Sequence, residues 1–393
     1  MRKFPVKAKG FAPRTIVRVI FLSELTASWQ PDLQFLVKIN TKDDFIKLQN
    51  LILAGLNNVS PLTSSFEIFE LWSDPAVLDD QDFFQDGDVA AISEGVISAH
   101  VLYRENDQHH TVFLTNRCNS NCLMCSQPPT REDDSWLIKE ACQIALHIRE
   151  SPTLLGFSGG EPLLLRDGLK QVFSTFIEKH PHTKFELLSN GRLLADSEFS
   201  AQLLESLNNK VTWMIPLYGH ADFLHDFIVQ SHGAFEETLA GLLNLHACKQ
   251  EIQLRTVLIR PVLEYLPAFC EFLSKNLPFI REVALMACEP IGFALANREL
   301  SDIDLRDWKY KLEEGVKILE RSNIKVIIMN APLCVLPADL RKYAHKSISD
   351  WKRKFEPECN ECSVKEDCSG LFTWYSKVND SMKINKIEGI VNV

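Results

Sequence analysis

From residue 110 onward, the chain alternates short apolar runs with longer stretches whose apolar residues recur at helical spacing. The short runs predict strands and the amphipathic stretches predict helices. Repeated strand–helix units with right-handed crossovers build a parallel sheet covered by helices. The expected strands are residues 112–115, 153–158, 184–189, 211–217, 252–259, 283–286 and 325–329, and the expected helices are residues 136–149, 169–179, 197–207, 235–247, 265–275 and 305–321.

The number of units separates an incomplete barrel from a closed one. About six units fall short of the eight that close a full TIM barrel. We therefore expect an α/β fold, a partial (βα)6 TIM-type barrel, over residues 109–329.

Two flanking segments differ from the barrel pattern. Residues 1–108 predict an N-terminal accessory domain without a catalytic motif, with strands at 14–22, 34–39 and 96–103 and a helix at 43–54. Residues 330–393 are too few for a core of their own and carry clustered cysteines. We expect them to form a small metal-stapled extension with one mixed helix around 338–351.

Composition and charge limit the classes of partner that the protein can have. The chain is 46% hydrophobic and 24% charged, as in ordinary globular proteins. A net charge of −10 argues against binding nucleic acid through broad phosphate neutralisation. No apolar run reaches the ~18 residues of a membrane span. The first residues show no apolar stretch followed by a small-residue cleavage site, so we do not expect secretion. We expect a cytoplasmic protein with neither nucleic acid nor membrane as a partner.

The cysteines carry the candidate chemistry. Eleven is an odd number for a chain expected in a reducing compartment, so a disulfide framework explains it poorly. Cys118, Cys122 and Cys125 follow the first barrel strand with the spacing C-x3-C-x2-C. Structural zinc normally takes four ligands, whereas three thiolates can hold a four-iron cluster with one iron open. Loops after barrel strands form the reactive face, which suits an open metal position.

A second motif follows the next expected strand, where residues 159–162 read Gly-Gly-Glu-Pro. Together with the cysteine spacing, it resembles the radical SAM superfamily. The resemblance implies a [4Fe–4S] cluster on Cys118, Cys122 and Cys125. It also implies S-adenosylmethionine (SAM) at the open iron, cleaved reductively to methionine and a 5′-deoxyadenosyl radical.

The same resemblance implies which residues contact SAM. The turn Gly159, Gly160, Glu161 and Pro162 corresponds to the one that holds the methionine amino group. Ser189 and Asn190, which end the third strand, resemble the polar ribose contact. Met124 stands where the family usually has an aromatic residue before the last cysteine, and there the backbone contacts the adenine.

A second cysteine group lies in the C-terminal extension. Cys359, Cys362 and Cys368 have the spacing C-x2-C-x5-C, and Cys334 lies upstream. Four thiolates suit one four-iron cluster or one zinc ion. The spacing resembles SPASM and twitch extensions, although Phe372 replaces a further cysteine usual there. We expect one auxiliary [4Fe–4S] cluster, with zinc as the alternative.

Longer stretches resemble the radical SAM maturases of His-Xaa-Ser systems, C-type component, over residues 90–375. They include LTNRCNSNCLMCSQPP (114–129), IPLYGH (215–220), GFALAN (292–297) and LCVLPADL (333–340). The resemblance implies a ribosomally made peptide or protein precursor as substrate. It also implies a second radical SAM maturase as partner, and an electron donor such as flavodoxin or ferredoxin.

Alternatives remain open at this level. One is a radical SAM enzyme acting on RNA or a small metabolite, and another is a non-catalytic, zinc-stapled protein-binding module. Cys288 is either a hydrogen-atom donor or a core thiol, and Asp133 and Asp134 are expected to cap the next helix. The loop after the fourth strand offers candidate substrate contacts in Tyr218, His220, Asp222, His225, Asp226 and His232.

Overall fold

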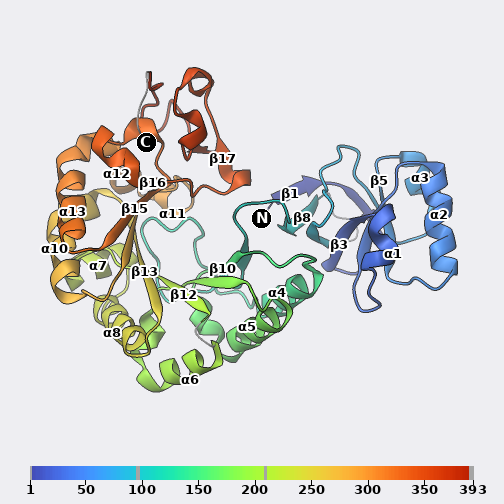
Figure 1. The fold of residues 1–393 in the computed structure, drawn as a ribbon, viewed down its shortest axis with the longest axis horizontal. Coiled ribbons are helices and arrows are strands. Elements are labelled where there is room, and N and C mark those ends of the chain that lie inside the picture. The colour runs from blue at the N-terminus through green and yellow to red at the C-terminus, as the bar shows by residue number, and fades with distance from the viewer. Residues whose placement is uncertain (1, 94–97, 208–209, 389–393) are drawn as a thin grey trace. The chain divides into compact units, whose positions relative to one another are not determined.

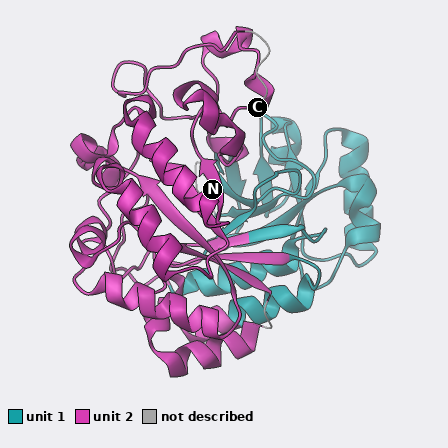
Figure 2. Ribbon diagram, turned by 60° about the vertical axis from the view of Figure 1, so that its left-hand side comes forward, with its two compact units in different colours: residues 1–113, 135–155, 171–183 teal, residues 114–134, 156–170, 184–393 magenta. Residues whose placement is uncertain are grey.

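The protein is described by a computed structural model covering residues 2–93, 98–207 and 210–388. Its chain divides into two compact units (Figure 2). The first unit comprises residues 1–113, 135–155 and 171–183, and the second comprises residues 114–134, 156–170 and 184–393. The two units are defined by contacts between residues, so each combines segments that are separate in the sequence. The three domain boundaries expected from the sequence therefore stay a prediction.

The first unit is built around an eight-stranded sheet. Its strands are β1 (Arg2–Pro5), β2 (Lys7–Lys9), β3 (Thr15–Phe21), β4 (Phe35–Lys38), β5 (Val59–Thr63), β6 (Ala76–Leu78), β7 (Val89–Ile92) and β8 (Ser98–Tyr103), and its short helices are α1 (Leu25–Ser28), α2 (Lys42–Leu53) and α3 (Phe66–Leu71). The strand order is β1-β8-β7-β3-β4-β5-β6-β2, and β3 to β6 run parallel. The predicted strands at 14–22 and 34–39 and the helix at 43–54 correspond to β3, β4 and α2. Residues 96–97 of the expected strand at 96–103 lie outside the described residues.

Both faces of this sheet are covered by apolar clusters. Side chains alternate between the two faces along each strand, so neighbouring residues enter different clusters. Val19 and Leu36 belong to one apolar cluster, and Ile20 and Val37 belong to the other. Helix α4 (Trp136–His147) is part of the same unit. Arg14 holds it through Glu140 at 2.5 and 2.9 Å, and the buried guanidinium of Arg18 donates to the carbonyl of His147.

The second sheet is the predicted barrel. Its strands are β9 (Thr111–Phe113), β10 (Leu154–Ser158), β11 (Lys184–Leu188), β12 (Val211–Pro216), β13 (Glu251–Leu258), β14 (Glu282–Ala287), β15 (Lys325–Met329) and β16 (Ala344–His345). Their spatial order follows the chain, and β11 to β16 are parallel. Among the described strands, β9 and β16 are the two ends of the order. The expectation of a partial barrel is confirmed.

Helices α6 (Ser197–Leu207), α8 (Ala234–Ala247), α10 (Leu266–Asn276) and α13 (Lys309–Arg321) cover the outside of this sheet (Figure 1). The other helices along this part of the chain are α5 (Asp167–Lys179), α7 (Asp222–Val229), α9 (Arg260–Glu264), α11 (Phe293–Ala296) and α12 (Arg298–Ser301). Helix α13 buries Leu312, Val316 and Leu319, an apolar stripe at helical spacing that packs against α10 and β15. Among the described residues, no helix combines the length and apolar character needed to cross a membrane.

Two expectations were wrong in this unit. The polar segment after β12 is not all loop, because α7 forms there with Leu224, Ile228 and Val229 buried. The single helix expected around 338–351 is replaced by the 3-10 turns Ala338–Tyr343 and Asp350–Lys352 with β16 between them. Ala344 pairs with Ile328 of β15, and this pairing draws the chain out of a helix. Strands β17 (Arg353–Lys354) and β18 (Leu371–Phe372) then form a small antiparallel ribbon.

Candidate functional site

The loop that carries Cys118, Cys122 and Cys125 begins directly after β9. Its start is fixed by Asp134, whose buried carboxylate accepts hydrogen bonds from the Thr115 hydroxyl and the Asn116 backbone. The expectation that Asp134 caps the following helix was wrong, since the N-cap of α4 is Ser135 and makes no side-chain cap bond. The Asp134 carboxylate instead accepts hydrogen bonds from the start of the cysteine loop.

The Gly-Gly-Glu-Pro turn at the end of β10 lies against the same loop. The backbone N–H of Gly160 donates to the Thr115 carbonyl, and that of Glu161 donates to the Arg117 carbonyl, both at 2.7 Å. A Cβ on Gly160 would lie 2.2 Å from the Arg117 carbonyl oxygen, and one on Gly159 would lie 2.7 Å from that of Thr115. Both positions therefore require glycine, because any side chain would push the cysteine loop away.

Glu161 joins this turn to the next strand. Its carboxylate is fully buried and accepts hydrogen bonds from the Leu163 N–H at 2.9 Å, the Ser189 hydroxyl at 2.8 Å and the Asn190 N–H at 2.6 Å. Burial raises the pKa of Glu161, and these three donors oppose the shift by favouring the anion. The Glu161 and Ser189 side chains thus hold the two turns together. Their expected contacts with SAM stay a prediction.

Arg192 connects the cysteine loop to the barrel and was missed in the sequence. Its guanidinium donates to the Asn119 carbonyl at 2.6 Å, to the Ser120 hydroxyl at 3.0 Å and to Glu237 at 2.6 Å. Beside it, the Asn190 amide donates to the Asn119 side chain at 2.6 Å. The one signal available was an arginine directly after the Ser-Asn-Gly that ends the strand.

The other side of the loop rests on the segment between β14 and α11. Gly292 has φ +63°, and a Cβ there would lie 2.5 Å from the Cys125 carbonyl oxygen. The Phe293 N–H donates to that carbonyl at 2.8 Å, and the Asn297 amide donates to the Leu123 carbonyl at 2.9 Å. Residues 292–297, GFALAN, therefore act as a backbone clamp on the cysteine loop.

Three thiols on one loop can hold a four-iron cluster, which spreads its thiolates over separate irons. Among the described residues, no group of three or more His, Cys, Asp or Glu side chains is placed to hold a metal ion, in either cysteine group. Burial raises the pKa of Cys118 to about 11 and that of Cys122 to about 12, and neighbouring thiols contribute to both shifts. A cationic cluster core would offset this cost of forming thiolates so close together.

The second cysteine group lines a cavity of about 370 Å³ in the C-terminal extension. The backbone N–H groups of Leu333 and Gly370 donate to the Cys368 sulfur at 3.4 Å, and that of Ile387 donates to the Cys362 sulfur at 3.5 Å. Such donors favour thiolates and tune a bound cluster. Cys334, Cys359, Cys362 and Cys368 all line this one cavity, and their role as a single ligand set stays a prediction.

The polar residues after β12 have mainly structural partners. His225 is buried, and its Nδ1 accepts the Tyr218 N–H at 3.3 Å, so burial lowers its pKa to about 4. Asp226 accepts the N–H groups of Gly233 and Phe235 at the start of α8. His220 packs with Phe223 and Tyr265, whereas Asp222 and His232 are exposed.

Comparison with known proteins covers this same region. Residues 112–273 match the family described as the radical SAM superfamily. A curated relative, the probable GTP 3′,8-cyclase of Methanocella arvoryzae, is 33% identical over 134 residues, which are 33% of this chain and 41% of the relative. The chain therefore spans less than half the length of that relative.

Solved structures show more distant likenesses. SuiB from Streptococcus suis, bound to S-adenosylmethionine, aligns with a TM-score of 0.45 and 13% identity over 56% of this chain and 49% of its own. The protein anSMEcpe, with bound AdoMet and a Cp18Cys peptide, aligns with a TM-score of 0.43 and 14% identity over 56% of this chain and 63% of its own. The family match is the finding that bears on identity, because its residues include the cysteine loop and the Gly-Gly-Glu-Pro turn. Residues 112–273 are thus similar to the radical SAM superfamily.

Proposed function

We propose that this protein is a radical SAM enzyme that modifies a ribosomally made peptide, as a maturase of a precursor with His-Xaa-Ser repeats. The observation that carries the radical SAM part is the fit between the cysteine loop and the turn after β10. Gly159 and Gly160 leave no room for a side chain against that loop. The spacing of the cysteines and the position of the turn thus form one structural unit rather than two coincident motifs.

The residues proposed to hold the cofactors come from the resemblance to the radical SAM superfamily. We assign the [4Fe–4S] cluster to Cys118, Cys122 and Cys125, and SAM binding to Gly159–Pro162, Ser189, Asn190 and Met124. When bound and reduced, the cluster supplies the electron that cleaves SAM into methionine and a 5′-deoxyadenosyl radical. Arg192 and Asn297 keep the loop in place from opposite sides, while Glu161 keeps the turns after β10 and β11 in register.

The second thiol cavity is proposed to hold an auxiliary [4Fe–4S] cluster rather than zinc. The backbone donors to Cys362 and Cys368 support a thiolate site. The residues that line this cavity are spread along the extension, from Leu333 to Ile387. A bound metal would therefore also order the extension.

The peptide substrate rests on sequence resemblance to His-Xaa-Ser system maturases over residues 90–375. The same resemblance supports a second radical SAM maturase as partner and a flavodoxin or ferredoxin as electron donor. The proposed cytoplasmic location rests on the sequence pattern alone.

A second candidate is a radical SAM enzyme acting on a small molecule. The relative named as a probable GTP 3′,8-cyclase favours it, since 134 aligned residues are 33% identical. A nucleoside triphosphate would then replace the peptide as substrate.

The decisive experiment is an anaerobic iron and sulfide count paired with a deoxyadenosine assay under dithionite. It compares the wild-type protein with the variant in which Cys118, Cys122 and Cys125 are all replaced by Ala. Adding a His-Xaa-Ser repeat peptide or GTP to parallel reactions shows which substrate is altered, as read by mass spectrometry.

We expect about eight irons in the wild type and about four in the variant, with deoxyadenosine lost in the variant. About four irons plus one zinc would keep the radical chemistry and make the second site structural. Zinc alone without deoxyadenosine would overturn the assignment as an enzyme and leave a metal-stapled binding protein. Turnover of GTP but not peptide would overturn the peptide substrate.

A further inference from the structure

A second cavity, of about 680 Å³, lies in the second unit beside the C-terminal extension. Part of this space is open to solvent. Cys288, just after β14, and Leu295 of α11 line one side, and Phe372, Tyr375 and Met382 line the other. We call this space the Cys288 cavity.

The Cys288 cavity adjoins both thiol sites. Pro332 and Leu371 line it and also line the cavity of the four thiols. On the other side, α11 supplies Leu295 to its wall and begins at Phe293, whose N–H donates to the Cys125 carbonyl. A group held in this cavity would therefore lie between the residues that fix the first thiol loop and those that enclose the second.

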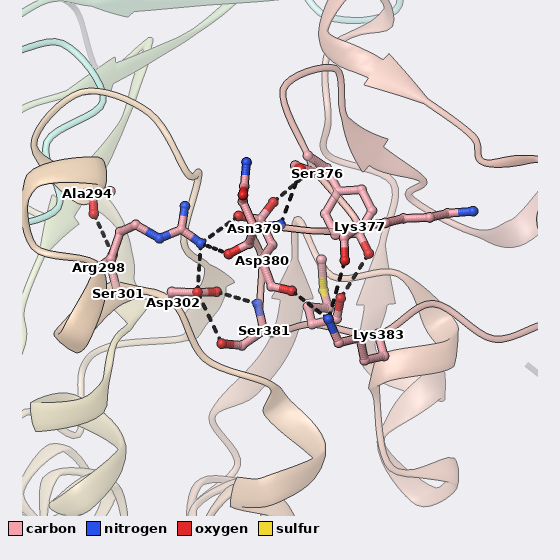
Figure 3. A network of polar contacts seen from close by, with 12 residues as sticks. Ala294, Arg298, Ser301, Asp302, Ser376, Lys377, Asn379, Asp380, Ser381 and Lys383 are labelled. Carbon is pink, nitrogen blue, oxygen red and sulfur yellow. Dashed lines mark hydrogen bonds and ion pairs between the residues drawn. The ribbon is translucent and has the colours of Figure 1, made fainter.

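The charged residues at the cavity are already paired with one another. Figure 3 shows Arg298 between Asp302 and Asp380, with hydrogen bonds of 2.8 and 3.0 Å to the two carboxylates. Ser381 also donates to Asp302 from its backbone N–H at 2.8 Å and from its hydroxyl at 3.1 Å. One guanidinium faces two carboxylates, so this cluster keeps a net negative charge and does not favour an anionic ligand.

Apart from Ser301 and Asn330, the remaining lining is apolar, aromatic or sulfur-bearing. Phe372, Tyr375, Cys288 and Met382 line the same space. Aromatic rings pack favourably both on other rings and against sulfur. An aromatic ring therefore matches this part of the lining better than an anionic group or a small polar group does.

One wall of the cavity is a strap, residues 376–387, that also closes the second thiol site. Asp380 and Met382 of the strap line the Cys288 cavity, while Asn385 and Ile387 line the thiol cavity. The pairs of Arg298 and Asp302 with the strap thus hold the wall of both spaces.

We propose that the Cys288 cavity binds an aromatic side chain of the substrate peptide. The identification of the bound group as part of a substrate rests on the proposed function. Binding of an aromatic group in the cavity can be measured without any turnover. Leu295 is 49% exposed at the cavity and Leu243 of α8 is 52% exposed outside it, which gives a matched pair of positions.

The test uses the full-length, anaerobically reconstituted protein and follows alkylation of Cys288 by N-ethylmaleimide with peptide mass spectrometry. The probes are N-acetyl-phenylalanine amide and, as the polar control, N-acetyl-serine amide. Leu295→Glu places a charge in the lining, and Leu243→Glu places the same charge elsewhere. Iron content and deoxyadenosine formation without peptide are measured on each preparation.

We expect the phenylalanine probe to slow alkylation of Cys288 several-fold and the serine probe to leave it unchanged. Leu295→Glu should abolish this protection, and Leu243→Glu should keep it. Equal protection by both probes, or protection that survives Leu295→Glu, would overturn the cavity assignment while deoxyadenosine formation stands. Absence of deoxyadenosine from the wild type would instead overturn the proposed function, and with it the substrate role of the cavity.

Discussion

The two cysteine groups of the second unit are fixed in opposite ways. In the first, distant elements grip the backbone of the loop, through the carbonyls of Arg117, Asn119, Leu123 and Cys125. In the second, backbone N–H groups point at the sulfurs of Cys362 and Cys368 themselves, and a strap covers them.

This difference separates two needs of a metal site. A loop held by its carbonyls is rigid while its thiol face stays available, which suits a cluster that must bind a further ligand. A site held by donors to sulfur and closed by a strap suits a cluster whose ligand set is complete. The comparison therefore predicts different consequences when each kind of support is removed.

The largest effect is expected from Gly160→Ala. Its Cβ would meet the Arg117 carbonyl at 2.2 Å and displace the first cysteine loop. Because misplacement by about 1 Å costs about 100-fold in a positioned site, deoxyadenosine formation should fall at least that far. Gly315→Ala in α13, where the nearest atoms lie 3.1 Å away, is the control and should keep activity. Wild-type rates for Gly160→Ala would refute the backbone grip.

The next effect concerns the second site. Cys334→Ala should lower the anaerobic iron count from about eight to about four while deoxyadenosine formation persists, because it removes one of four thiolates from a closed cluster. Cys248→Ala, at an exposed cysteine outside both sites, should leave the count unchanged. An unchanged count for Cys334→Ala would remove this residue from the ligand set.

A smaller effect is expected from Arg192→Ala, which removes the hydrogen bonds to Asn119 and Ser120. Hydrogen bonds from charged groups contribute about 1.5–3 kcal/mol, so the rate of deoxyadenosine formation should fall roughly tenfold to hundredfold. Iron should still bind. Arg260→Ala, at an exposed arginine that donates to the Glu299 carbonyl, is the matched control. Loss of iron together with activity would show that Arg192 supports the fold rather than the geometry of the loop.

The smallest effect is expected from Arg298→Ala, which frees the strap from one of its anchors at Asp380. It is best measured in the background lacking the first three cysteines, where the second cluster alone absorbs light. Bleaching in air should then be several-fold faster, because the wall that includes Ile387 loosens. Lys275→Ala, which breaks an exposed pair with Glu271, should bleach at the parent rate. Equal bleaching of both variants would mean that the strap does not shield the site.

Much of the barrel could be predicted from sequence, because buried parallel strands are continuous apolar runs ended by turn residues. The strand expected at 184–189 is β11, Lys184–Leu188, and the helix expected at 197–207 is α6. Helix α7 was missed because its eight residues mix Asp and His with the apolar stripe, so that the segment resembled a polar loop.

The supports of the cysteine loop could not be predicted, since each depends on a contact between residues far apart in sequence. Arg192 lies 73 residues from Asn119, and Asn297 lies 174 residues from Leu123. Asp134 shows the same limit. Local pattern favours a helix cap, whereas the folded chain supplies a better donor pair in Thr115 and Asn116.

The long reach of the clamp on Leu123 and Cys125 also sets an order of events during biogenesis. The cysteine loop is made early, but the partners that fix it, Phe293 and Asn297, are synthesised well over 100 residues later. Contacts of such high sequence separation form late in folding. A cluster delivered before residue 297 has folded would meet three thiols on a loop without these supports, so we expect the proposed cluster to be inserted late in folding.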